Sequence, residues 1–221
     1  ISPILANIYM HNVLTLWYKF VIKSNTFGNS FLAVYADDFI AGFQYKEDAE
    51  RYYVLLKERL KKFNLELEES KSRMIEFGRY AETNSKRKYG KKPETFDFLG
   101  FTFYCGKGKR SRNFCVKLKT NCKKFQQKLK ATKEWLYENR TMPVKEMISK
   151  LNLKLVGHYK YYGVSHNSAK IGAFLHFVQR YLYKVLNRRS HKRSYTWDGY
   201  IEMLKVYPLA KPKILHSPFF R

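Results

Sequence analysis

The stretch FLAVYADDFIAGF, residues 31–43, decides how this chain is interpreted. Segments 31–34 and 39–43 are short apolar runs that contain β-branched and aromatic residues, and this pattern predicts two buried strands. Asp37 and Asp38 lie between them, at or beside the expected turn. Because a tight turn breaks the alternation of side chains along a strand, both carboxylates can approach one cation.

The two adjacent aspartates are therefore candidate ligands for Mg²⁺. This ion prefers hard oxygen ligands and takes one or two protein carboxylates, with phosphate oxygens and water completing its octahedron. Two such ions can activate a hydroxyl and stabilise a leaving phosphate. The alternative is that aspartate simply favours turns. The flanking strands and the order Tyr35-Ala36-Asp37-Asp38 favour the metal site.

The charge of the chain points to a polyanionic partner. The 221 residues include 43 Lys and Arg against 18 Asp and Glu, a net charge of +25. Residues 1–100 hold 16 basic and 13 acidic side chains, whereas residues 101–221 hold 27 and 5. A membrane surface is the alternative partner, but no run of about 18 apolar residues and no signal-peptide pattern occurs. Nucleic acid is therefore the favoured partner.

Aromatic residues are interleaved with the basic residues of the second half. This composition suits phosphate neutralisation combined with base stacking, although most of these rings are equally compatible with a hydrophobic core. Tyr161 lies off the apolar stripe of its predicted helix and is the better surface candidate. The interleaved rings are Phe125, Trp135, Tyr137, Tyr159, Tyr161, Tyr162, Phe174, Phe177, Tyr181 and Tyr183.

The cysteines and histidines do not predict a zinc site or a disulfide framework. Cys105, Cys115 and Cys122 lack C-x-x-C spacing, and none of the six histidines pairs with a cysteine at ligand spacing. We therefore expect reduced thiols in a cytoplasmic protein, and no zinc-dependent nuclease module.

The first half predicts a mixture of helices and strands. Ser2 as N-cap and Pro3 begin an expected helix with apolar positions up to Phe20, and Asp48 is expected to cap a second helix that ends near Phe63. Residues 65–77 predict strand and turn, and the polar residues 81–95 predict a loop. Strands are expected over 96–103 and 113–118, joined by a basic turn at 106–110. The apolar positions expected on the first helix are Ile4, Leu5, Ile8, Val13, Leu16, Trp17 and Phe20.

The second half predicts a helical bundle. Apolar stripes run over 122–136, over 144–162 after Pro143, and over 171–185 with Asn167 or Ser168 as the cap. Three amphipathic stripes of this length can bury one another. A short helix is expected near 200–206.

Five segments, in order, resemble the reverse transcriptases encoded by group II introns, together with their maturase-specific thumb. Residues 1–10 (ISPILANIYM) are similar to the helix that follows the family's Pro-Gln-Gly turn, and Tyr35–Asp38 to its catalytic Tyr-Ala-Asp-Asp. Residues 65–72 are similar to the segment whose lysine lies near the incoming nucleotide. Residues 96–101 are similar to its primer-gripping hairpin, and 157–162 to its thumb motif Gly-Trp-x-x-Tyr-Tyr, with histidine where tryptophan is usual.

The resemblance implies an α+β fold, in which part of a polymerase palm, an antiparallel sheet with helices, precedes an all-α thumb bundle. The implied domains are the C-terminal part of the palm (1–104), a basic hairpin or linker (105–118), the helical thumb (119–187) and a basic C-terminal extension (188–221). The expected location is the cytoplasm of a bacterium, or an organelle.

The resemblance also implies the roles of individual residues. Asp37 is the expected principal metal ligand and Asp38 the second or supporting one, with two Mg²⁺ ions in the intact enzyme. Tyr35 is expected near the primer terminus, and Lys71 beside the leaving pyrophosphate. The residues expected to grip the primer are Phe98, Leu99 and Gly100.

The implied partners are group II intron RNA, an RNA template with a DNA primer, and deoxynucleoside triphosphates, with no membrane partner. The thumb and its flanking segments are expected to carry the RNA contacts. The residues expected to bind RNA are Lys107, Lys109, Arg110, Arg112, Lys123, Lys124, Lys160, Tyr161, Arg188, Arg189, Lys192 and Arg193.

One departure from the family concerns activity. In the family another catalytic aspartate and the Pro-Gln-Gly turn lie upstream of the segment that corresponds to Ile1. We therefore expect a truncated enzyme that binds RNA and does not polymerise alone. The alternatives are a maturase that binds intron RNA without catalysis, and a reverse transcriptase of a retron or diversity-generating element.

Overall fold

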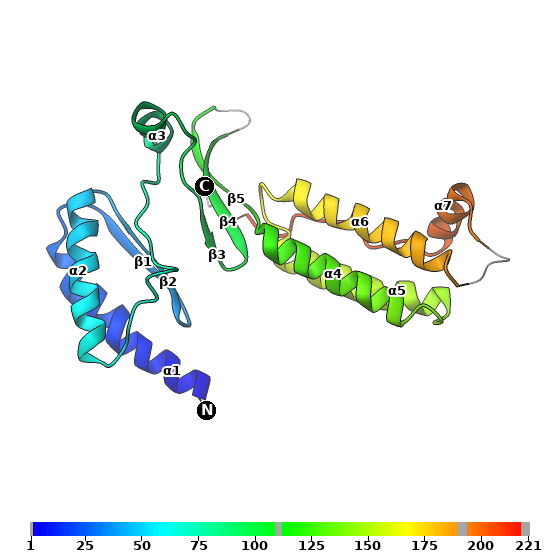
Figure 1. Ribbon diagram of the computed structural model, residues 1–221, viewed down its shortest axis with the longest axis horizontal. Coiled ribbons are helices and arrows are strands. Elements are labelled where there is room, and N and C mark those ends of the chain that lie inside the picture. Colours follow the sequence, from blue (N-terminus) through cyan, green and yellow to red (C-terminus); the bar gives the residue numbers. More distant parts are fainter. Residues whose placement is uncertain (1, 109–111, 190–193, 218–221) are drawn as a thin grey trace. The chain divides into compact units, whose positions relative to one another are not determined.

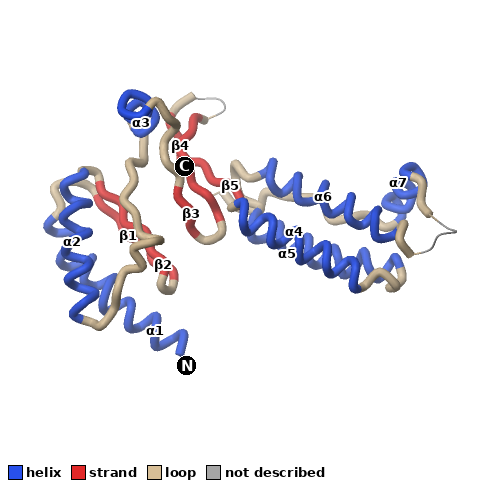
Figure 2. The backbone as a smooth tube through the Cα atoms, viewed as in Figure 1, coloured by secondary structure: helices blue, strands red, loops and turns tan. Residues whose placement is uncertain are grey.

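The computed structural model describes residues 2–108, 112–189 and 194–217. Within these ranges the chain forms seven α-helices and two antiparallel sheets of two and three strands, which confirms the predicted α+β class. The chain divides into two compact units, Ile1–Ile75 and Glu76–Arg221. Figure 1 shows the order of their elements, and Figure 2 shows the same backbone coloured by secondary structure.

The first unit begins with a long helical segment that contains wide turns. Helix α1 (Ser2–Met10) continues into π-helical turns at His11–Leu16 and Tyr18–Ile22. Each π turn adds a residue to the helical repeat and so rotates the apolar stripe. The predicted stripe was partly wrong, both in α1 before these turns and at Phe20 within them. Ile4, Leu5, Ile8 and Phe20 are exposed, whereas the buried side chains are Val13, Leu14, Tyr18 and Ile22.

A hairpin and one helix complete the core of the first unit. Strands β1 (Ser30–Tyr35) and β2 (Asp38–Phe43) pair antiparallel, as predicted, and α2 (Lys46–Lys62) packs its buried face against the same core. Asp48 is not the N-cap of α2, because Tyr45 occupies that position. Its buried carboxylate instead accepts hydrogen bonds from the backbone N–H groups of Phe27 and Gly28.

The segment between the two sheets differs from the prediction in two places. Residues 65–77 form no strand; they contain a turn in which Lys71 and Ser72 donate their N–H groups to the carbonyl of Glu68. Residues 81–95 are not a simple loop, because α3 occupies Ala81–Tyr89. Only Ala81 of this helix is buried, so it lacks the apolar stripe that reveals a helix in a sequence.

The second unit starts from a three-stranded sheet. Strand β3 (Phe96–Phe98) pairs with β4 (Phe101–Lys107), which pairs with β5 (Phe114–Thr120), all antiparallel. The strand near residues 113–118 is therefore confirmed, whereas the stretch 96–103 is divided into two strands by a turn at Leu99 and Gly100. Since β4 and β5 extend past residues 104 and 118, one sheet spans the expected boundaries between palm, basic hairpin and thumb.

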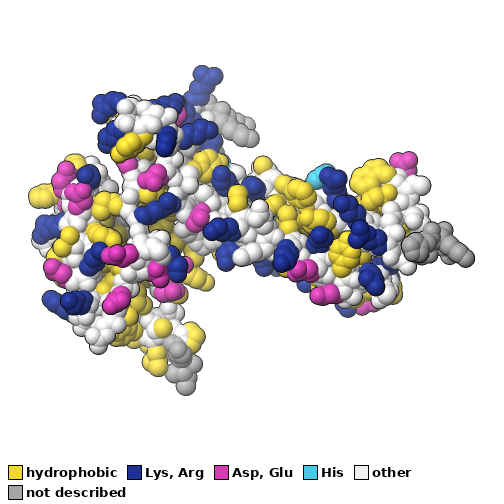
Figure 3. Space-filling model, in the orientation of Figure 1, with side chains coloured by type: hydrophobic (Ala, Val, Ile, Leu, Met, Phe, Trp, Pro, Cys, Tyr) yellow, Lys and Arg dark blue, Asp and Glu magenta, His cyan; other side chains and the backbone are white. Residues whose placement is uncertain are grey.

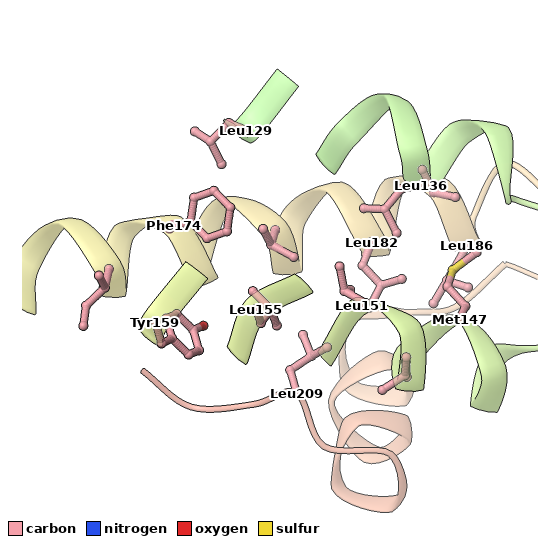
Figure 4. Close-up of a cluster of buried hydrophobic side chains, with 14 of the residues drawn as sticks. Leu129, Leu136, Met147, Leu151, Leu155, Tyr159, Phe174, Leu182, Leu186 and Leu209 are labelled. Atoms are coloured by element: carbon pink, nitrogen blue, oxygen red, sulfur yellow. The ribbon is translucent and has the colours of Figure 1, made fainter. Parts of the chain in front are cut away.

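The helices of the second unit follow the predicted stripes closely. They are α4 (Cys122–Glu138), α5 (Val144–Tyr162), α6 (Ser168–Leu186) and the short α7 (Trp197–Val206). Figure 4 shows leucine side chains of α4, α5 and α6 meeting in one core. Of the predicted core positions, Cys122 differs, because it is exposed at the start of α4.

Asn167 joins the sheet to the helices. It occupies the N-cap position of α6, as predicted, but its side chain makes no capping bond. The side chain is fully buried, and its Oδ1 accepts from the backbone N–H of Thr120 at 2.8 Å. Its Nδ2 donates to Thr120 Oγ1 and to the carbonyl of Tyr162, each at 2.8 Å. This buried amide therefore connects the end of β5 to the end of α5.

The segment after α7 runs along α5. Asn152 donates to the carbonyl of Pro208 and accepts from the N–H of Ala210, and Leu209 enters the helical core. Further along, Val164 and His216 form an isolated parallel bridge. Part of the predicted C-terminal extension is thus packed on the bundle.

Candidate functional site

The two aspartates lie at the tip of the first hairpin, as predicted. Tyr35 pairs with Asp38, so Ala36 and Asp37 form a two-residue turn. Tyr35, Asp37 and Asp38 are all exposed, and the strands below them are anchored in the core of the first unit. The hairpin therefore presents both carboxylates to solvent on a supported backbone.

The backbone of this turn is strained at Ala36, whose φ is +53°. A left-handed conformation costs a residue other than glycine about 1 kcal/mol, and turns of this length usually place Asn or Gly there. Strain of this kind collects at functional sites, where the surrounding structure maintains it. The conformation of Ala36 is thus maintained by the packed strands below the turn and not by its own local preference.

The donor set fits Mg²⁺. No group of three or more His, Cys, Asp or Glu side chains able to hold a metal occurs among the residues that the structure describes. Two adjacent carboxylates nevertheless suffice for an ion that completes its shell with phosphate oxygens and water. Asp37 and Asp38 would be the protein ligands of such an ion.

Lys71 belongs to the same compact unit as the aspartates and is exposed on the turn that follows Glu68. Within the described ranges, no hydrogen bond or ion pair joins its side chain to Asp37 or Asp38. Its expected role beside the leaving group therefore depends on the bound substrate.

The expected primer-gripping residues lie in the second unit, at the turn between β3 and β4. Leu99 has φ +48° and Gly100 has φ +73°, the pair of left-handed residues that defines a type I′ hairpin. The carbonyl of Leu99 accepts from the hydroxyl of Tyr161 at 2.9 Å, and the carbonyl of Gly100 accepts from the N–H of Asn121 at 2.9 Å. Both carbonyls of the turn are therefore held by the helical part of the unit.

The expected RNA-binding side chains differ in exposure. Lys107, Arg112, Lys123, Lys124, Lys160, Tyr161 and Arg188 are exposed. Arg189 is half-buried, with Nη2 placed 3.4 Å from the sulfur of Met147, and burial lowers the pKa of its guanidinium. Figure 3 shows Lys and Arg side chains along the visible face of the helices. The remaining four, Lys109, Arg110, Lys192 and Arg193, lie outside the described residues.

Basic side chains of the helical part lie on aromatic rings, and Lys133 is one that the sequence-based set lacked. Lys133 lies over Tyr181, and Arg188 both lies over the Tyr137 ring and donates to its hydroxyl at 2.9 Å. An open hollow is lined by Lys133, Tyr137 and Arg188 together with Lys130, Glu134 and Glu138. Lys130 and Lys133 are three residues apart on the exposed face of α4, and this spacing was the sequence signal that could have added them to the predicted RNA-binding residues.

His158 of the thumb motif is buried. Its ring stacks on Phe174 with centroids 3.8 Å apart, and neither ring nitrogen has a hydrogen-bond partner within the described part of the chain. Burial, with a smaller contribution from the positive charge of Lys128, lowers the pKa of His158 to about 4. The imidazole therefore acts as a neutral packing group where the family usually has tryptophan.

This burial predicts an acid-sensitive thumb. The unfolded chain binds a proton on His158 below its ordinary pKa of 6.5, whereas the folded chain binds it only near pH 4. The neutral ring therefore makes its full contribution to the free energy of unfolding above pH 6.5. This contribution decreases by about 3 kcal/mol as the pH falls from 6.5 to 4. Urea unfolding of His158→Phe should lose much less stability than the parent over this range. The exposed His176→Gln serves as control, and parental acid sensitivity in His158→Phe would contradict the assignment.

Across the described residues, no helix is both long enough and apolar enough to cross a membrane.

An acidic two-stranded hairpin supported by helices, followed by a strand-and-helix unit, is a polymerase palm segment with its thumb. Residues 1–103 match the family of reverse transcriptases (RNA-dependent DNA polymerases), and residues 122–200 match the maturase-specific domain of group II introns. The chain belongs to the family of group II intron reverse transcriptases and maturases. No curated protein matches it.

Proposed function

We propose that this chain supplies the acidic hairpin and the thumb of an enzyme that adds deoxynucleotides to a primer on an RNA template. The observation that carries this proposal is the exposed Asp37-Asp38 pair on a strained, well-supported turn. A protein that only binds RNA has no need of two adjacent carboxylates held toward solvent at a hairpin tip.

The roles of the side chains follow from charge and position. Asp37, in the turn itself, is the principal ligand of Mg²⁺, and Asp38 at the start of β2 is the supporting one. Bound Mg²⁺ would supply positive charge that stabilises the reacting phosphate. The ring of Tyr35 packs beside the primer terminus, and Lys71 carries positive charge toward the leaving pyrophosphate. The turn at Leu99 and Gly100 positions the primer strand.

We propose that these 221 residues bind RNA without polymerising alone. The family uses a further catalytic aspartate, and the described residues place no third acidic side chain in a metal-binding group with Asp37 and Asp38. Template-directed incorporation by this chain would overturn this part of the proposal.

A second candidate function is RNA binding in support of intron splicing. The match to the maturase-specific domain and the concentration of 27 basic side chains in residues 101–221 favour it. Both functions can belong to one protein, because the hairpin and the basic helices lie in different units.

Primer extension on an RNA template in the presence of Mg²⁺ tests the proposal. The chain should be assayed alone and, where its gene encodes residues upstream of Ile1, also in that longer form. Extension by the longer form supports a reverse transcriptase. Tight RNA binding by the longer form without extension would instead support a maturase that has no polymerase activity.

A further inference from the structure

Tyr161 makes contacts that its place in the sequence does not predict. Its hydroxyl donates to the backbone carbonyl of Leu99 at 2.9 Å, across 62 residues of chain. Its ring stacks on Phe101, with centroids 5.8 Å apart and planes inclined by 12°. Helix α5 thus contacts both the tip of the β3–β4 hairpin and the first residue of β4.

The hairpin tip that Tyr161 contacts is strained. A leucine at φ +48° is unfavourable, and a type I′ turn normally carries Asn-Gly rather than Leu-Gly. The tip also lies close against the helix, because a Cβ on Gly100 would stand 3.1 Å from the hydroxyl of Tyr162. Local sequence alone therefore favours this turn weakly, and external hydrogen bonds stabilise it.

We propose that Tyr161 is a positioning residue that holds the primer-gripping turn in its type I′ conformation. This inference rests on the proposed function. The turn lies in the same compact unit as the thumb helices and in a different unit from Asp37. Tyr161 therefore links the turn directly to helix α5 of the thumb. Loss of its hydroxyl leaves the primer bound but places its end poorly for reaction.

The test compares Tyr161→Phe with Tyr183→Phe in the form of the protein that extends primers. The first variant removes the hydroxyl and keeps the ring on Phe101. The second removes a hydroxyl of the same unit that is bonded to the carbonyl of Tyr195 instead of to the hairpin. Hydrogen exchange of the amides in residues 96–103 should quicken about fivefold in Tyr161→Phe alone, as expected for one net hydrogen bond.

Catalysis should change in a matching way. In Tyr161→Phe, kcat for addition of a single nucleotide should fall about fivefold, while Kd for the primer–template duplex stays within about twofold of the parent. Tyr183→Phe should match the parent in both. If loss of a hydroxyl acted only through general stability, kcat would fall in both variants, and this result would overturn the proposal.

A rescue variant separates positioning from other causes. Leu99→Asn creates the Asn-Gly pair that type I′ turns prefer, so in the Tyr161→Phe background it should return hairpin exchange to nearly the parental rate. Unchanged exchange in Tyr161→Phe overturns the inference, and so does failure of this rescue. A parent that extends no primer overturns the proposed function and the role in primer positioning, while exchange still decides whether Tyr161 holds the turn.

Discussion

Replacing Asp37 by asparagine is expected to reduce primer extension by at least about a hundredfold in the form of the protein that extends primers. The change removes a negative charge and keeps nearly the same shape, so a group that acts by charge loses its role. The fold should survive, because Asp37 is exposed at a turn of the first unit. Steady-state kcat/KM for primer extension measures the loss of activity, and a circular dichroism melt shows whether the fold is retained.

Glu58→Gln is the matched control for this variant. Glu58 is also an exposed carboxylate of the first unit, on α2 and away from the turn. It should extend primers as the parent does. Extension by Asp37→Asn at nearly the parental rate would exclude Asp37 as the principal metal ligand, and an equal loss in Glu58→Gln would show that net charge alone is responsible.

RNA affinity is expected to fall about a thousandfold between 50 and 200 mM salt, as for a protein that neutralises about six phosphates. The reason is the imbalance of 27 basic against 5 acidic side chains in residues 101–221. Each phosphate contact releases counterions, so salt opposes binding in proportion to the number of contacts. Fluorescence anisotropy of a labelled, structured RNA at several salt concentrations gives the slope.

Two double variants, each changing a pair of neighbouring lysines, test where on the protein the phosphates bind. Changing both Lys123 and Lys124, exposed at the start of α4, to alanine should reduce the salt slope by about 2. Changing both Lys61 and Lys62, an exposed pair at the end of α2, should leave the slope unchanged. A flat salt dependence of the parent, or equal changes in both double variants, would exclude the thumb as the main phosphate-binding surface.

The accuracy of the sequence-based predictions followed the strength of the apolar pattern. The stripes of α5 and α6 were predicted well, because burial requires apolar residues at the period of the element. The two strands of residues 31–43 were predicted in place, but they are half-buried and not buried as expected. Helix α3 was missed because it buries only Ala81. The stripe of the first helix was partly wrong. Ile4, Leu5 and Ile8 of α1 are exposed although they are apolar, and the π turns from His11 onward, which no local signal announced, change the helical repeat.

Individual polar residues were harder to assign than elements. Asp48 and Asn167 both suit helix caps, and both instead bind backbone groups from distant parts of the chain. A capping preference is local, whereas the burial of an unpaired N–H elsewhere in the fold is not visible in sequence. Tyr161 was correctly predicted to lie at the surface, yet its contact with Leu99 was not foreseen.

The sequence by itself determined the family, the excess of basic charge and the acidic hairpin, because these depend on residue type and on short-range patterns. Only the tertiary structure decided that the turn at Leu99 and Gly100 belongs to the same unit as the thumb helices and that Tyr161 and Asn121 bind its carbonyls. Such pairings depend on the packing of segments far apart in the chain. The free energy that selects them comes from burial and hydrogen bonds formed after the local elements exist.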